Sequence, residues 1–215
     1  MLLSHLKFDT SPTEDSGVGG YTWNAYSNLP TITTKDGKTC AYFDGSTSGL
    51  ISTKQYFPNI DAYKDDWMVS CNVNFTITSE MHIVSKWDLD QSSSLQPFLL
   101  NVDGCKFQLF MNGNGIIPTN QWNLISAVHT NKNIYLYINN VLTDTIVETY
   151  IDATSLNSID PFTIGFTCNY IDNYNEEKFN GYMSDFRIYK DEISIPVSRY
   201  EIFDDSDKNY YGVKA

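Results

Sequence analysis

Carboxylates are the first side chains to test for catalysis in this 215-residue chain. Glycosidases built on a β-sandwich carry E-x-D-x-x-E on one strand, because hydrolysis of a glycosidic bond uses a pair of carboxyl groups. None of the glutamates begins that pattern; they are Glu14, Glu80, Glu148, Glu176, Glu177, Glu192 and Glu201. The histidines, His5, His82 and His129, are isolated and show no metal-ligand spacing. We therefore expect no enzyme, and a glycoside hydrolase-related enzyme is the less favoured alternative.

Two segments combine aromatic rings with amides and carboxylates, the side-chain types that bind sugars. Aromatic faces stack on sugar rings, while amides and carboxylates hydrogen-bond sugar hydroxyls. One segment begins at Trp87, and the other runs from Asn169 to Asn175. The predicted carbohydrate-binding residues are Trp87, Asp88, Asp90, Tyr170, Asp172 and Tyr174. The alternative is that these polar residues only keep two long loops soluble.

Charge and composition exclude several classes of partner. The formal net charge is -12, and Arg187 and Arg199 are the only arginines, so no basic patch for nucleic acid is expected. The acidic surface is either simply solvated or has affinity for calcium. No apolar stretch approaches the length of a membrane span, and MLLSHLKFD does not read as a signal peptide. The four cysteines form no C-x-x-C pair, which favours free thiols.

The chain's hydrophobic pattern has a period of two. From Trp67 to Ile77 the odd positions are apolar and most even positions are polar, which is typical of a half-buried strand. Ile134, Leu136 and Ile138 alternate in the same way, as do Ile164, Phe166 and Cys168; these sets predict further strands. A short helical turn near Ile195–Phe203 is the one helical candidate.

Turn signals separate these runs at short intervals. Asp103-Gly104 and Asn139-Asn140 stand between alternating segments and predict hairpins. Asp36-Gly37 and Asn112-Gly113 mark further reversals. Many short strands without helices predict an all-β, two-sheet antiparallel sandwich or jelly roll.

Four segments, taken in order, resemble the laminin-G-like, concanavalin A-like jelly-roll family. The opening LLSHLKFDTSPTEDSG is similar to the family's first strand and Asp-Ser-Gly turn, and Ala41–Ser52 to its A-x-F-D-G strand. Gln121–Ile146 resembles the Trp-led strand and its L-Y-x-N-G hairpin, with Asn140 in place of the glycine. Phe179–Ser194 resembles the closing strand with its D-F-R-I-Y sequence. We assign residues 1–203 to this domain and 204–215 to an acidic, tyrosine-containing tail.

The resemblance implies that the first and last strands are neighbours in one sheet. A structural calcium ion often lies at that edge in this fold, so Asp9 and Asp185 are the expected metal ligands. The alternative is that Asp185 pairs with Arg187 or Lys7. Ligands in the family generally bind at loops of one rim of the sandwich or on its concave face. Both predicted loops are therefore candidates for the binding site.

The resemblance extends to bacteriophage virion proteins, which often carry such domains with similar opening and closing strands. It implies a virion structural protein, as a capsid decoration, head fibre or tail component, that contacts host-surface glycans and other virion proteins. Homo-oligomers are expected for fibre parts. The alternative is a carbohydrate-binding module of a bacterial surface or secreted protein.

Overall fold

The computed structural model describes residues 1–52, 65–76, 79–86, 98–109, 112–147, 162–168, 175–176 and 178–191. These residues form strands and turns, which confirms the predicted all-β class. No helix long and apolar enough to cross a membrane occurs within these ranges. The strands are β1 (Leu2–Leu6), β2 (Trp23–Ala25), β3 (Thr31–Lys35), β4 (Lys38–Asp44), β5 (Leu50–Ser52), β6 (Trp67–Phe75), β7 (Met81–Lys86), β8 (Phe98–Asp103), β9 (Lys106–Leu109), β10 (Asn112–Ile116), β11 (Asn123–Thr130), β12 (Asn133–Ile138), β13 (Val141–Val147), β14 (Thr163–Ile164), β15 (Thr167–Cys168), β16 (Asn175–Glu176) and β17 (Asn180–Lys190).

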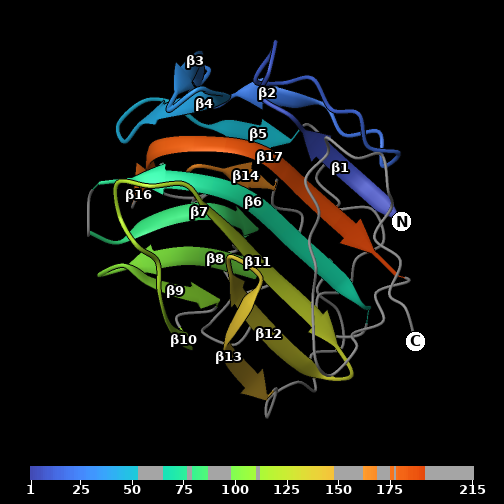
Figure 1. The fold of residues 1–215 in the computed structure, drawn as a ribbon. Coiled ribbons are helices and arrows are strands. Elements are labelled where there is room, and N and C mark those ends of the chain that lie inside the picture. The colour runs from blue at the N-terminus through green and yellow to red at the C-terminus, as the bar shows by residue number, and fades with distance from the viewer. Residues whose placement is uncertain are drawn as a thin grey trace.

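Two antiparallel sheets form the two layers of a sandwich (Figure 1). The eight-stranded sheet has the order β13-β12-β11-β6-β17-β4-β3, and β1 pairs with β17 beside this path. The seven-stranded sheet has the order β10-β9-β8-β7-β14-β5-β2, and β15 pairs with β16 separately. The first strand and the closing strand β17 are therefore neighbours, as the family resemblance implied.

The hydrophobic core lies between the two sheets, and the alternating positions fill it. Along β6, the odd residues from Trp67 to Phe75 are at most 3% exposed. The Phe179 ring meets the rings of Phe43 and Phe75 edge to face, with centroids 5.8 and 6.4 Å apart. Each large side chain buried in this way contributes about 1.5–3 kcal/mol of hydrophobic free energy. Period-two patterning therefore predicted the inward face of this strand correctly.

Two of the predicted hairpin turns form as expected. At Asp36–Gly37 and Asn139–Asn140 both turn residues have positive φ, between 50° and 80°, the conformation that matches the twist of paired strands. The turn predicted at Asp103–Gly104 is displaced by one residue. Gly104 and Cys105 occupy it with φ of 55° and 67°, and Asp103 pairs with Lys106.

Two further predictions differ from the structure. Asn112–Gly113 lies within β10 and is not itself a reversal. The set from Ile164 to Cys168 is not one strand, because Gly165 interrupts it with φ of 85°. A side chain there would also collide, since a Cβ would lie 2.5 Å from the ring of Phe43. The helical turn predicted near residues 195–203 lies outside the described residues.

Candidate functional site

The closing strand β17 changes its partner halfway along. Residues Asn180–Met183 pair with β4, whereas Phe186–Tyr189 pair with β1, and the register against β6 shifts between these halves. Asp185 lies at this irregularity with φ of 55°, and its backbone N–H donates to the Lys7 carbonyl at 3.3 Å. A β-bulge turns one side chain out of the regular alternation. Here the bulge turns the Asp185 carboxylate toward β1.

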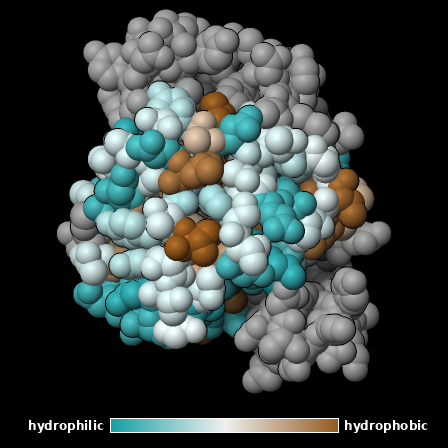
Figure 2. All heavy atoms as spheres, turned by 90° about the horizontal axis from the view of Figure 1, so that it is seen from above, coloured by the Kyte–Doolittle hydropathy of each residue, from teal (hydrophilic) through white to brown (hydrophobic). Residues whose placement is uncertain are grey.

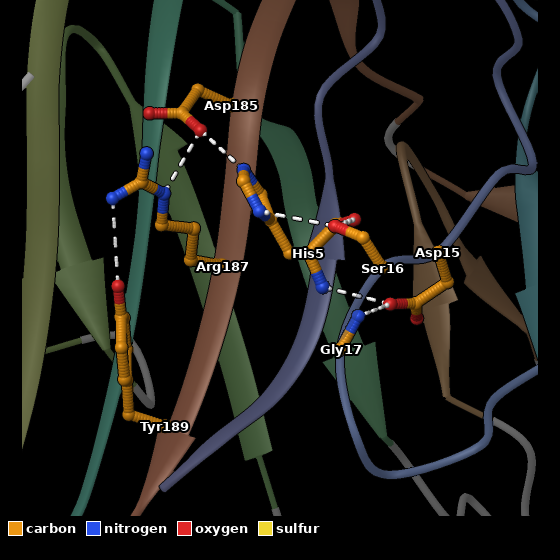
Figure 3. A network of polar contacts seen from close by, with 7 residues as sticks. All are labelled: His5, Asp15, Ser16, Gly17, Asp185, Arg187 and Tyr189. Atoms are coloured by element: carbon orange, nitrogen blue, oxygen red, sulfur yellow. Dashed lines mark hydrogen bonds and ion pairs between the residues drawn. The ribbon is translucent and has the colours of Figure 1, made fainter. Parts of the chain in front are cut away.

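Asp185 is the centre of a polar network that joins β1 to β17 (Figure 3). His5 Nε2 lies 2.7 Å from Asp185 Oδ1, and Arg187 Nε donates to the same oxygen at 2.9 Å. Arg187 Nη1 donates to the Tyr189 hydroxyl at 3.5 Å. Burial alone would raise the pKa of Asp185, but the hydrogen bond from His5 and the charge of Arg187 outweigh burial and lower it. The carboxylate is therefore ionised and held by two partners.

Asp15 fastens the opening turn to β1. Its Oδ1 accepts the backbone N–H groups of His5 and Gly17, both at 2.8 Å. Its Oδ2 accepts Ser4 Oγ at 2.6 Å and Trp23 Nε1 at 2.9 Å. A Cβ on Gly17 would lie 2.3 Å from a β1 carbonyl oxygen. The Asp-Ser-Gly sequence thus requires aspartate for four hydrogen bonds and glycine for its close approach to β1.

Hydrogen bonds link Ser16, His5 and Asp185 in the spatial order of a nucleophile, a base and an orienting acid. Ser16 Oγ lies 3.2 Å from His5 Nδ1. Acyl transfer also requires N–H donors aimed at the developing oxyanion. The two N–H groups at this turn are engaged elsewhere: Ser16 N–H donates to the His5 carbonyl at 3.0 Å and Gly17 N–H to Asp15. Among the described residues these two N–H groups are not available to an oxyanion, and the geometry fits a structural network that anchors the turn.

The predicted calcium ligands are Asp9 and Asp185. Asp9 follows β1 and is exposed, and its Oδ1 accepts Thr10 Oγ1 at 3.3 Å. Calcium takes six to eight oxygen ligands, whereas the groups bound to Asp185 are the nitrogen donors of His5 and Arg187. Across the described ranges no three His, Cys, Asp or Glu side chains are grouped to hold a metal ion. The arrangement fits the alternative pairing with Arg187, and calcium binding stays a prediction.

A second polar cluster lies on the outer face of the seven-stranded sheet. His82 in β7 pairs with Asn101 in β8, while the adjacent pair, Met81 and Val102, is buried in the core. Asn101 Nδ2 donates to Glu80 Oε1 at 3.2 Å, and the same oxygen lies 3.6 Å from His82 Nε2. Burial lowers the pKa of His82 to about 4. At neutral pH the imidazole is therefore uncharged, and its approach to Glu80 is a polar contact and not an ion pair.

Sequence reasoning treated His82 as isolated, and the structure brings Glu80 and Asn101 to it. Asn101 lies on the next strand, and no sequence pattern gives the register between β7 and β8. The register also shifts between His82 and Val84, which breaks the alternation that would have shown where His82 points. The residues predicted from the two aromatic loops lie outside the described residues; they are Trp87, Asp88, Asp90, Tyr170, Asp172 and Tyr174.

Comparison with known families identifies the superfamily of this chain. Residues 10–195 match the family model described as the concanavalin A-like lectin/glucanases superfamily. The chain belongs to this superfamily. No curated protein sequence matches this lectin-fold chain.

Solved structures share the fold of this lectin-fold domain at low sequence identity. Domain 4 of AbnA, an extracellular GH43 arabinanase from Geobacillus stearothermophilus solved with arabinotriose, matches with a TM-score of 0.61 and 18% identity over 88% of this chain and 92% of that domain. The binding domain of botulinum neurotoxin serotype D matches with a TM-score of 0.59 and 15% identity over 90% of this chain. Trypanosoma rangeli sialidase in complex with the inhibitor DANA matches with a TM-score of 0.59 and 10% identity over 87% of this chain. The match spans 48% of the toxin domain and 30% of the sialidase, and at these identities the similarity shows the fold alone.

Proposed function

We propose that this lectin-fold domain binds carbohydrate without cleaving it. The observation that carries the proposal is the cluster of Glu80, His82 and Asn101 on the outer face of the seven-stranded sheet. Glu80 supplies an accessible carboxylate that can accept hydrogen bonds from sugar hydroxyls, and His82 and Asn101, 5% and 0% exposed, lie buried against it. The Glu80 side chain is 26% exposed, so a ligand can reach it.

The same cluster argues for binding over hydrolysis. Glycosidases of the common mechanisms need two carboxyl groups, one on each side of the scissile bond. The cluster supplies one carboxylate, Glu80, and burial keeps its neighbour His82 uncharged. The sequence likewise lacks the E-x-D-x-x-E pattern. Non-catalytic binding is therefore the function that fits these residues best.

The solved structures support the class of ligand. One is a domain solved with arabinotriose, another is a toxin binding domain, and the third is a sialidase with an inhibitor. The arabinanase domain also supports a second setting for this chain, as a carbohydrate-binding module of a bacterial surface or secreted protein, because the match spans 92% of that domain.

We place the domain on a bacteriophage particle, as a capsid decoration, head fibre or tail component that contacts host-surface glycan. This placement is supported by the opening segment and the closing D-F-R-I-Y strand, which resemble those of virion proteins, and by the Arg-poor composition. Mass spectrometry of purified particles would detect the chain as a stoichiometric component. Its absence from particles, with detection at the bacterial surface or in the medium, would favour the alternative setting.

Binding is tested with a glycan array and two matched variants. Glu80→Gln removes the charge of the cluster, and Glu14→Gln makes the same change at an exposed residue of the opening segment. We expect the wild-type protein and Glu14→Gln to bind the same glycans and Glu80→Gln to lose them. Equal binding by all three proteins would contradict the assignment of the site, and no binding by the wild-type protein would contradict the function.

A further inference from the structure

A tyrosine–lysine patch occupies the other sheet, at the β3–β4 hairpin; we define it as Lys35, Lys38, Tyr42, Trp122 and Tyr182. Lys35 and Lys38 are directly opposite each other across the hairpin, and Tyr42 is directly opposite Tyr182. Side chains two residues apart on a strand share one face, so Lys38 and Tyr42 lie on the same side of β4. Because the intervening Ala41 is buried in the core, this side is the outer face of the eight-stranded sheet.

Each lysine of the patch lies over an aromatic ring. Lys35 Nζ is 5.8 Å from the centroid of the Tyr182 ring, and Lys38 Nζ is 5.1 Å from that of Trp122. The Tyr42 and Tyr182 rings are 5.1 Å apart and tilted by 39°, and Trp122 Nε1 donates to the Lys35 carbonyl at 3.2 Å. All five side chains are half-buried. The patch therefore combines aromatic faces with two half-buried lysine side chains.

The charges of the patch favour an anion. Like charges directly opposite each other in a sheet repel, so the Lys35–Lys38 pair is unfavourable for the hairpin. Asp36 is the acidic group beside them, with Oδ1 3.3 Å from Lys35 Nζ, which leaves the patch with one net positive charge. The chain as a whole has a net charge of -12 and only 14 basic residues. A local positive charge on such a protein attracts a negatively charged ligand.

Unused hydrogen-bonding groups lie beside the patch on the same face. Asn74 is opposite Tyr182, and Ser184 is two residues beyond Tyr182 on β17. Asn74 Oδ1 and Ser184 Oγ are buried, and neither has a hydrogen-bond partner within the described part of the chain. Buried polar atoms in folded proteins are usually bonded. Both side chains are at most 2% exposed, so these atoms lie below the surface of this face and add to its polarity without themselves being open to a ligand.

The surface at this end of the molecule suits a polar ligand better than a lipid. Figure 2 shows the end where β2, β3 and β4 lie, and apolar residues appear there as separate spots among hydrophilic and intermediate ones. Protein and membrane docking sites generally present a large continuous apolar area. The visible surface offers no such area.

We propose that the tyrosine–lysine patch binds a carboxylate-bearing saccharide. The sugar ring packs against Tyr42 and Tyr182, and the carboxylate lies between Lys35 and Lys38. The inference rests on the proposed function, since it assumes a carbohydrate ligand, and it adds a second site on the opposite sheet from Glu80. The inference also specifies that the preferred glycan is negatively charged.

The test compares acidic and neutral saccharides by isothermal titration calorimetry. The probes are tri-galacturonic acid and sialyllactose, with lactose as the neutral control, at about 0.05 M and about 0.5 M salt. The wild-type protein should bind an acidic probe more tightly than lactose, and the higher salt should weaken that binding. The double variant Lys35→Gln/Lys38→Gln should lose about tenfold in affinity for the acidic probe, while lactose binding stays unchanged.

Two controls test whether the effect belongs to the patch. Lys106→Gln removes one lysine charge at an exposed residue of β9 and should leave the acidic preference intact. Near-ultraviolet circular dichroism checks that the variants are folded. If acidic probes bind no tighter than lactose, or if Lys35→Gln/Lys38→Gln binds like wild type, the patch is not the site. If Glu80→Gln abolishes neutral-glycan binding while the lysine variants bind like wild type, the proposed function stands and the patch fails. If the lysine variants alone weaken acidic binding, carbohydrate binding stands and the site at Glu80 fails. If the wild-type protein binds neither acidic nor neutral saccharide, the proposed function fails together with the patch.

Discussion

The buried His82 makes stability depend on pH over an interval that extends above the range where carboxylates titrate. Burial lowers its pKa to about 4, against an ordinary value of 6.5. The unfolded chain therefore binds a proton at His82 more readily than the folded chain does. As a result, the free energy of unfolding falls as the pH falls from 6.5 toward 4. The interval between these values, at about 1.4 kcal/mol per pH unit, corresponds to a loss of about 3 kcal/mol.

Urea unfolding at a series of pH values between 7.5 and 4, followed by tryptophan fluorescence, measures this loss. The variant His82→Gln removes the titrating group, so its stability should fall by about 3 kcal/mol less over that range than the wild-type stability does. The comparison uses the slope of the unfolding free energy against pH, because the substitution also changes stability at pH 7.5. Parallel pH profiles for the two proteins would refute the reasoning and would mean that His82 is solvated or charged in the folded state.

Three further predictions concern carboxylates of known environment. Asp15→Ala leaves four donors without an acceptor, Trp23 Nε1 among them, and should cost about 3 kcal/mol in urea unfolding; a loss below about 1 kcal/mol would contradict the role of Asp15 as an anchor. Burial alone would raise the pKa of Asp44, but hydrogen bonds from the following loop residues lower it well below its ordinary value, so Asp44 stabilises the fold above about pH 4 and this stabilisation is lost at lower pH. Asp44→Asn should cost about 1 kcal/mol of unfolding free energy at pH 7 and should flatten the dependence of stability on pH below pH 4. An unchanged pH dependence below pH 4 would count against this role of Asp44. Calcium added to chelator-treated protein tests the predicted ligands Asp9 and Asp185: a rise in melting temperature that Asp185→Asn abolishes would support the calcium site, and an unchanged melting temperature would favour the pairing of Asp185 with Arg187.

The sequence pattern predicts a strand correctly where one face of the strand is buried and the other is polar. Along β6 this pattern gave the inward residues correctly, and the turn at Asn139–Asn140 follows from the tolerance of asparagine for positive φ. The strand expected from Ile164 to Cys168 failed because Gly165 takes a positive φ, which its hydrophobic neighbours do not reveal. Hydrophobic patterning reports burial and carries no information on a local backbone reversal.

The candidate sites depend on pairings that local sequence does not contain. Tyr42 and Tyr182 are opposite each other although 140 positions separate them in the chain, and the bulge at Asp185 arises where β17 changes partner. The family resemblance supplied one such pairing, between the first and last strands. The opposition of Lys35 and Lys38 was accessible from sequence, since a two-residue turn at Asp36–Gly37 places its flanking residues opposite each other.

Whether the domain binds carbohydrate without cleaving it is tested most directly by one incubation on defined glycans. The wild-type protein is bound to a glycan array, the positive glycans are incubated with it in solution for days, and their masses are then measured. We expect saturable binding that Glu80→Gln weakens, with every glycan recovered intact. No binding to any glycan, or recovery of shortened glycans that Glu80→Gln leaves whole, would contradict non-catalytic carbohydrate binding.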